Sequence, residues 1–213
     1  ETKFGELQRR GWQAAGDPVR FTFGPFEVTE WITRGPDGLT FALIERHKPT
    51  LEGWPHLKDF SRAFNATQVV DDLEASLSFY RDVLGFKEYL SHSGASSGDG
   101  SNVLGLPKNL AREIVRDVWI GHPQGINEGS VELLAFQGVE GRDFSGQAVP
   151  PNLGMLALRF PVKGMDAFIR HLEQHDIPLS GGPVSLDLQP YGEVRIIGVK
   201  APNGSLLEFF EVD

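Results

Sequence analysis

The sequence of 213 residues contains no cysteine. This absence excludes disulfide bonds, thiolate nucleophiles and the cysteine-based types of zinc or iron–sulfur site. No run of apolar residues approaches the roughly 20 that a membrane-spanning helix needs, and no signal-peptide pattern is visible in the first residues. We therefore expect a cytoplasmic protein without a membrane partner.

Positive charge is also scarce, because 20 lysines and arginines stand against 29 aspartates and glutamates and the net charge is −9. Lysine and arginine form no run, which argues against nucleic acid and against an anionic membrane surface as partners. Phosphate-binding loops are missing, since neither GxGxxG nor GxxxxGKS/T occurs. The chain is expected to use no nucleotide cofactor and to act on a small molecule.

Two stretches of the sequence repeat one pattern. FNATQVVDDLEASLSFYRDVLGF at 64–86 is echoed by LGMLALRFPVKGMDAFIRHLEQHDIPL at 153–179. In each stretch a β-rich run precedes apolar residues at helical spacing, which are Leu73, Leu77, Tyr80 and Leu84 in the first copy and Met165, Phe168, Ile169 and Leu172 in the second. Short strand candidates follow at 86–92, 118–122 and 130–136, and again at 194–200 and 205–212. The order βαβββ is predicted twice, and two such units usually build one cavity between them.

The first 50 residues predict half of a third copy. Residues 34–46 can be laid on 200–212 without a gap, which places Ala42 on Glu208. The strand and helix that would precede this half do not occur in the sequence, and we expect an upstream part to be missing. The predicted organisation is a partial module over 1–50, a linker over 51–63 and a domain over 64–213 with modules at 64–140 and 153–213.

The stretches SLSFYRDVLGF and APNGSLLEFFE resemble the vicinal oxygen chelate superfamily, which includes glyoxalase I, extradiol dioxygenases and bleomycin-resistance proteins. The resemblance covers residues 64–213. It implies an α+β fold in which paired βαβββ modules form a cup-shaped mixed sheet around a divalent metal. It also implies a homodimer. The superfamily spans several reaction types, so the fold does not fix the function.

The resemblance places the metal-ligand positions at Asn65, Glu132, Ala157 and Glu208. Family members carry His or Gln on the first strand of each module, where this chain has Asn65 and Ala157. The missing imidazoles argue against an extradiol dioxygenase. Asn65, Glu132 and Glu208 are hard oxygen ligands that suit magnesium, manganese or calcium better than zinc, and Ala157 would leave an open corner. An empty site is the alternative, in which Glu132 and Glu208 raise each other's pKa and act as catalytic acid and base.

Other candidates for the substrate pocket are His92 and His122, which end two predicted strands. A cation such as Arg112 or Arg116 comes from the long segment 91–119, which is predicted to form a lid or a surface loop. The helical pair His171 and His175 is predicted to lie outside the cup, because the apolar stripe of Met165, Phe168, Ile169 and Leu172 puts the two histidines on the flank of the helix. The glutamate between them is also one place off the HExxH pattern, which argues against a zinc site.

Two functions remain open. Retention of both carboxylates favours a lyase or isomerase of small-molecule metabolism that uses Glu132 and Glu208, with or without a metal. Loss of both first-strand ligands favours a protein that only binds or sequesters its ligand, as bleomycin-resistance proteins do. The 15 phenylalanines and 4 tryptophans suggest an aromatic or otherwise hydrophobic ligand.

Overall fold

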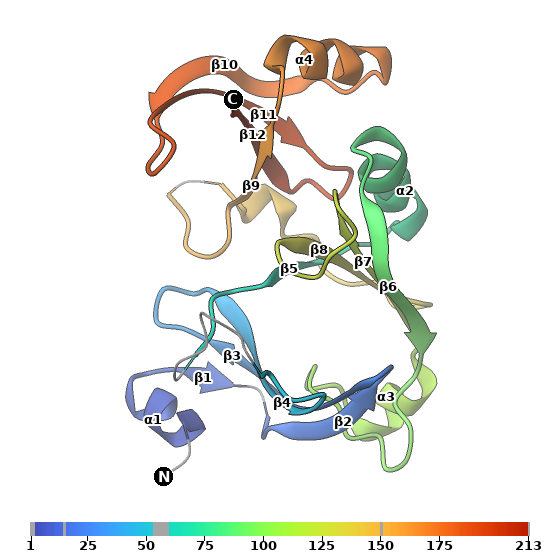
Figure 1. Ribbon diagram of the computed structural model, residues 1–213. Coiled ribbons are helices and arrows are strands. Elements are labelled where there is room, and N and C mark those ends of the chain that lie inside the picture. Colours follow the sequence, from blue (N-terminus) through green and yellow to red (C-terminus); the bar gives the residue numbers. More distant parts are fainter. Residues whose placement is uncertain (1–2, 15, 53–59, 150, 213) are drawn as a thin grey trace.

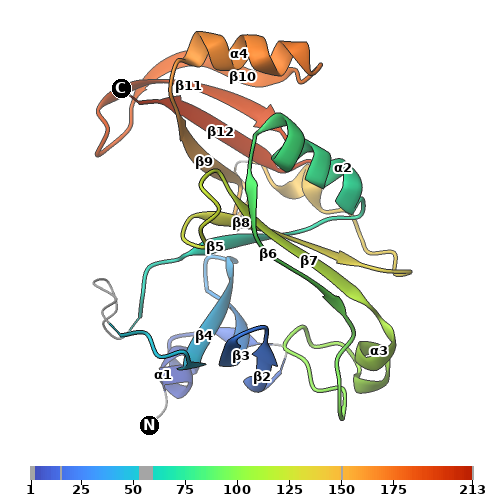
Figure 2. The ribbon, with the colours of Figure 1, turned by 45° about the vertical axis from the view of Figure 1, so that its right-hand side comes forward.

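The computed structural model describes residues 3–14, 16–52, 60–149 and 151–212. These residues form a mixed α+β structure with three four-stranded sheets. We call them sheet A (β1 to β4), sheet B (β5 to β8) and sheet C (β9 to β12). Sheet A lies below sheet B in Figure 1 and sheet C lies above it, and the turned view of Figure 2 keeps this order.

Sheets B and C confirm the predicted repeat. The elements of the first unit are β5 (Asn65–Val69), α2 (Leu73–Leu77), the π-helix η1 (Ser78–Val83), β6 (Lys87–Gly94), α3 (Lys108–Glu113), β7 (Arg116–His122) and β8 (Ser130–Phe136). Those of the second are η2 (Ser145–Gln147), β9 (Ala157–Val162), α4 (Met165–Gln174), β10 (Leu179–Asp187), β11 (Glu193–Lys200) and β12 (Leu206–Glu211). The strand orders are β5-β8-β7-β6 and β9-β12-β11-β10. β5 runs parallel to β8, and β9 runs parallel to β12. The other hydrogen-bonded pairs of strands in these two sheets are antiparallel.

The first helix begins and ends where the sequence signals predict. Asp72 is the N-cap, and its Oδ1 accepts a hydrogen bond of 2.9 Å from the backbone N–H of Ala75. This bond satisfies one of the N–H groups that a helix start leaves without a partner. Gly85 has a φ of +72°, and the next residue, Phe86, bonds back to the carbonyl of Tyr80 at 2.9 Å. The glycine ends the helix because side-chain-bearing residues rarely adopt this left-handed conformation.

Sheets B and C share one hydrophobic core. Its fully buried members include Val131 and Leu133 of β8 and Leu207 of β12. A polar contact also joins the modules: Asn203 of the second donates to Gln68 Oε1 of the first at 3.1 Å, and Tyr80 of the first donates to the same oxygen at 2.9 Å. Because side chains alternate along a strand, Glu132 and Glu208 project from the opposite faces of their sheets, away from this core.

The N-terminal segment contains α1 (Lys3–Arg9), β1 (Gln13–Ala14), β2 (Val19–Phe23), β3 (Phe26–Arg34) and β4 (Thr40–Lys48). β1 and β2 pair with successive parts of β3, and β4 pairs with nearly all of it. Trp31 anchors the helix to the sheet, with its ring 5.0 Å from that of Phe4. Sheet A matches the last three strands of the repeated unit, and no described residue forms the strand that would run parallel to β4.

Candidate functional site

The face of sheet B that carries Glu132 is turned toward sheet A (Figures 1 and 2). Two interactions show that these sheets face each other. The ring of Phe23 in β2 lies 5.1 Å from the ring of His92 in β6, in an edge-to-face arrangement. Glu30 in β3 is close enough to Glu132 in β8 for their charges to interact. The site with the most unusual chemistry therefore lies between sheets A and B.

Glu132 is held by its neighbours on β5. Asn65 Nδ2 donates a hydrogen bond of 3.0 Å to Glu132 Oε2, and Thr67, which stands beside Glu132 in the parallel register, donates a second. Burial raises the pKa of Glu132, while these hydrogen bonds act in the opposite direction. The carboxylate is thus desolvated yet oriented by two donors, as a catalytic base requires.

Glu30 faces this group from sheet A. Trp31 and Thr33 are buried on one face of β3, and alternation puts Glu30 on the other face with Val28. Burial raises the pKa of Glu30 to about 7, and the charge of Glu132 adds to the increase. Glu30 therefore gains or loses its proton near neutral pH. We call Glu30, Asn65, Thr67 and Glu132 the inter-sheet site.

Sequence reasoning missed Glu30. When residues 34–46 are aligned with 200–212, the position of the last-strand carboxylate falls on Ala42, because Ala42 takes the place of Glu208. The alignment therefore gives no candidate carboxylate in the N-terminal segment. The signal that was available is local: in FEVTEWITR, Glu30 shares a strand face with Val28 and Ile32. A carboxylate between two apolar residues of one face indicates either a functional group or an edge position.

Apolar side chains surround the inter-sheet site. The strand registers place Val19, Phe21, Phe26 and Val28 on the inner face of sheet A, and Leu90, Val118, Ile120 and Leu134 on that of sheet B. Val28, Ile120 and Leu134 are buried, whereas the other five are only partly covered. These apolar side chains surround two carboxyl groups whose pKa values are raised, which makes the inter-sheet site the candidate functional site.

Glu208 has a different environment. Its Oε2 lies 2.5 Å from the Nε of Arg159, which is the residue beside it on β9 in the parallel register. Ala157 lies on the same face, opposite Leu206. The structure therefore brings Asn65 and Glu132 together but does not bring Glu208 to them, because the two carboxylates lie on opposite sides of the shared core.

The three oxygen ligands predicted for a divalent metal are therefore not assembled. Asn65 and Glu132 are in contact, while Glu208 is neutralised by Arg159. Within the described ranges no group of three or more His, Asp or Glu side chains is placed to hold a metal ion. The donor set does not fit the metal site that the resemblance implies.

The other predicted pocket residues are scattered. His92 is exposed against Phe23, and His122 accepts a hydrogen bond of 3.0 Å at Nδ1 from the N–H of Gln124. Burial lowers the pKa of His122. Arg112 is exposed on α3, whereas Arg116 lies on the inner face of sheet B. Whether 91–119 acts as a lid stays a prediction.

The helical histidines have structural contacts. The Nε2 of His171 lies 2.7 Å from the carbonyl oxygen of Val83, so this ring joins the two modules. The ring centre of His175 lies 4.4 Å from that of His171. They do not contribute to the inter-sheet site.

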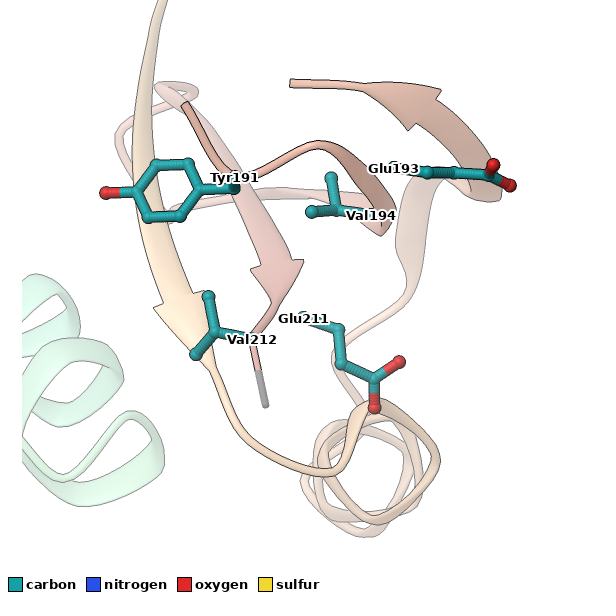
Figure 3. A pocket seen from close by; sticks show the side chains of 5 residues that line it. All are labelled: Tyr191, Glu193, Val194, Glu211 and Val212. Atoms are coloured by element: carbon teal, nitrogen blue, oxygen red, sulfur yellow. The ribbon is translucent and has the colours of Figure 1, made fainter. Parts of the chain in front are cut away.

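Two surface pockets occur elsewhere. The pocket in Figure 3 has a volume of about 220 Å³ and is lined by Tyr191, Glu193, Val194, Glu211 and Val212. Glu211 already accepts a hydrogen bond of 2.8 Å from the N–H of Met165 at the start of α4. A second pocket of about 240 Å³ lies beside Arg34 and Leu153. Neither pocket includes a residue of the inter-sheet site.

Comparison with known proteins gives the class. Residues 62–209 match the model of the Glyoxalase/Bleomycin resistance protein/Dioxygenase superfamily, and the chain belongs to this superfamily. It is 27% identical over 143 residues to the uncharacterised protein YaeR of Escherichia coli, an alignment that covers 67% of this chain and 90% of YaeR. A glyoxalase family protein from Bacillus cereus has the same fold, with a TM-score of 0.55 and 20% identity over 71% of this chain and 94% of its own. In the part of the chain that the structure describes, no helix is long and apolar enough to cross a membrane.

Proposed function

We propose that the protein is a glyoxalase-superfamily enzyme that moves a proton on a small organic molecule, as an isomerase or a lyase. The observation that carries this proposal is the pairing of Glu30 and Glu132 across sheets A and B, where burial raises the pKa of both groups and the charge of Glu132 raises that of Glu30 further. Two carboxyl groups with different proton affinities supply an acid and a base at the same pH.

The two groups have different roles. Glu132, oriented by Asn65, is the base, and it takes a proton from the carbon next to a carbonyl group. Glu30 is the acid, and it gives its proton to the carbonyl oxygen as the negative charge develops there. An enol forms, Glu132 carries one new proton, and Glu30 becomes a carboxylate. When the substrate carries a β,γ double bond, Glu132 returns its proton to the γ-carbon of the dienol and Glu30 recovers the enol proton, so that the double bond has moved into conjugation with the carbonyl and both groups are restored.

Glu208 has no part in this scheme, because its carboxylate pairs with Arg159 on sheet C. The scheme contains no metal step, since the donor set expected for the metal is not assembled. The cytoplasmic location and the homodimer that we expect from the sequence remain predictions.

A binding protein without chemistry is the second candidate. The observation that favours it is the partly covered apolar lining of the inter-sheet site, combined with Asn65 at a position where catalytic relatives carry His or Gln. Such a protein would hold a hydrophobic ligand between sheets A and B, and it would need neither carboxylate to be ionised.

The test is proton exchange in D₂O, followed by NMR on a panel of aromatic and aliphatic ketones and 2-oxo acids. We expect the wild type to incorporate deuterium next to the carbonyl of at least one compound. Glu132→Gln should lower that rate by about 10² or more, and Glu208→Gln, the matched control on the other sheet, should leave it unchanged. Chelation with EDTA should also leave it unchanged. Ligand binding without exchange would favour the binding protein, and equal loss in both variants would contradict the assignment of Glu132 as the base.

A further inference from the structure

Arg116 lies on the same face of sheet B as Glu132. β7 and β8 pair without a register shift, so that Arg116 stands opposite Phe136, Val118 opposite Leu134, and Ile120 opposite Glu132. Arg116 is four residues from Ile120. At about 3.3 Å per residue, its Cα lies about 13 Å along the sheet from the level of Glu132.

Arg116 lacks an anionic partner among the described residues. Its Nη2 donates a hydrogen bond of 3.0 Å to the hydroxyl of Ser96, a neutral group. The side chain is partly buried, and this burial lowers its pKa. Arg159 and Arg195, two other arginines on the sheets, are paired with carboxylates, Arg159 with Glu208 and Arg195 with Asp166. A partly desolvated guanidinium without a counter-ion is a site where an anion gains binding energy.

An apolar band separates Arg116 from the inter-sheet site. Sheet B contributes Val118, and sheet A contributes Phe26 and the ring of Phe23, which contacts His92. The guanidinium of Arg46 lies 4.8 Å from the ring centre of Phe26, so sheet A also carries a cation on this side of the band. Along the facing surfaces of the two sheets, the order is therefore the pair of Glu30 and Glu132, the apolar band, and the cations Arg116 and Arg46.

We propose that the ligand of this site is an amphiphilic monocarboxylate, with a hydrophobic body that covers the apolar band and a carboxylate bound by Arg116. This inference rests on the proposed function only for the reaction at the other end of the ligand. Ionised Glu132 repels the carboxylate end, and Arg116 attracts it, so the ligand has one orientation. Its reactive carbon then lies beside Glu30 and Glu132.

The experiment compares phenylalkanoates that have two to six methylene groups with their neutral amides, by isothermal titration calorimetry. We expect at least one acid to bind the wild type about tenfold or more tightly than its amide, in line with a charge-assisted hydrogen bond. Arg116→Gln should remove this preference by weakening the acid alone. Arg112→Gln, which changes an exposed arginine of α3, should bind like the wild type. Arg116→Lys should retain part of the preference, because it keeps the charge.

Three results would overturn the proposal: no acid binds more tightly than its amide, no compound binds at all, or Arg112→Gln weakens the acid as much as Arg116→Gln does. Thermal unfolding of every variant identifies any that fails to fold. If Arg116→Gln fails to fold, the preference of Arg116→Lys for the acid over its amide tests the proposal. The variant Glu132→Gln distinguishes a failure of the proposed function from a failure of the anion site. If that variant leaves turnover unchanged while Arg116→Gln still removes the preference for the acid, the proton-transfer role fails and the anion site stands.

Discussion

Glu30 and Glu132 face each other from different sheets, and the charge of Glu132 contributes to a pKa of about 7 for Glu30. The relationship depends on the N-terminal segment, because β3 supplies Glu30 while the repeated unit supplies Glu132. The site is therefore built by packing one sheet against another, and either sheet alone contains only a single carboxyl group of the pair.

The first prediction concerns stability and pH. The pKa of Glu30 rises from 4.5 to about 7 on folding, so the folded protein binds more protons than the unfolded chain between these values. Stability from protonated Glu30 is complete below pH 4.5 and is lost as the pH rises through 7.

The variant Glu30→Gln tests this dependence, because its side chain stays neutral at all pH values. At pH 8 it should be more stable than the wild type by about 3 kcal/mol, and at pH 4 nearly equal. Urea unfolding at both values measures this, and the comparison cancels groups such as His122 that shift in the opposite direction. Equal stability at pH 8 would contradict it.

The second prediction concerns the pH profile of turnover. The proposed acid must be protonated and the proposed base ionised, so kcat/KM should fall on both sides of a maximum, with the alkaline limb near pH 7. Replacement of Glu30 by Gln should lower the rate and remove the alkaline limb, because no proton is left to lose there. An unchanged alkaline limb in this variant would mean that another group acts as the acid.

The third prediction concerns Asn65. Its hydrogen bond favours the ionised form of Glu132, so Asn65→Ala should raise the pKa of Glu132 further and move the acid limb of the profile upward. Activity at pH 6 should fall more than activity at pH 8. Asn152→Ala, which removes an exposed hydrogen bond to the carbonyl of Gln147, is the control and should follow the wild type. An equal loss at both pH values would indicate a different role for Asn65.

The fourth prediction concerns the core that sheets B and C share. Leu207 is fully buried, and Leu153 is 74% exposed. Leu207→Ala should lower the free energy of unfolding by about 2–5 kcal/mol through the cavity that it leaves, and Leu153→Ala should change it by less than about 0.5 kcal/mol. Chemical denaturation followed by circular dichroism measures both. A small effect at Leu207 would show that the two modules do not depend on a common core.

The repeated unit could be predicted from the sequence because its signals are local. The Asp72 cap, the apolar spacing from Leu73 to Leu84 and the stop at Gly85 all lie within one stretch of chain. The pairing of Glu132 could not be predicted in this way. Alternation places Glu132 on a face of β8, but it does not say which sheet covers that face. The family resemblance suggested Glu208, whereas the packing of the N-terminal sheet supplies Glu30.

The fully buried core described above contains residues of sheets B and C and none of sheet A. Sheet A is held to sheet B by fewer and more exposed contacts, such as that between Phe23 and His92. Proteins open in parts, and the least buried part opens first. Sheet A should therefore detach at a lower free energy than global unfolding requires, and its backbone amides should exchange with solvent while those of β8 and β12 stay protected. The same opening of sheet A separates Glu30 from Glu132. It therefore gives ligands a route to the inter-sheet site, and it interrupts proton transfer until the sheets close again.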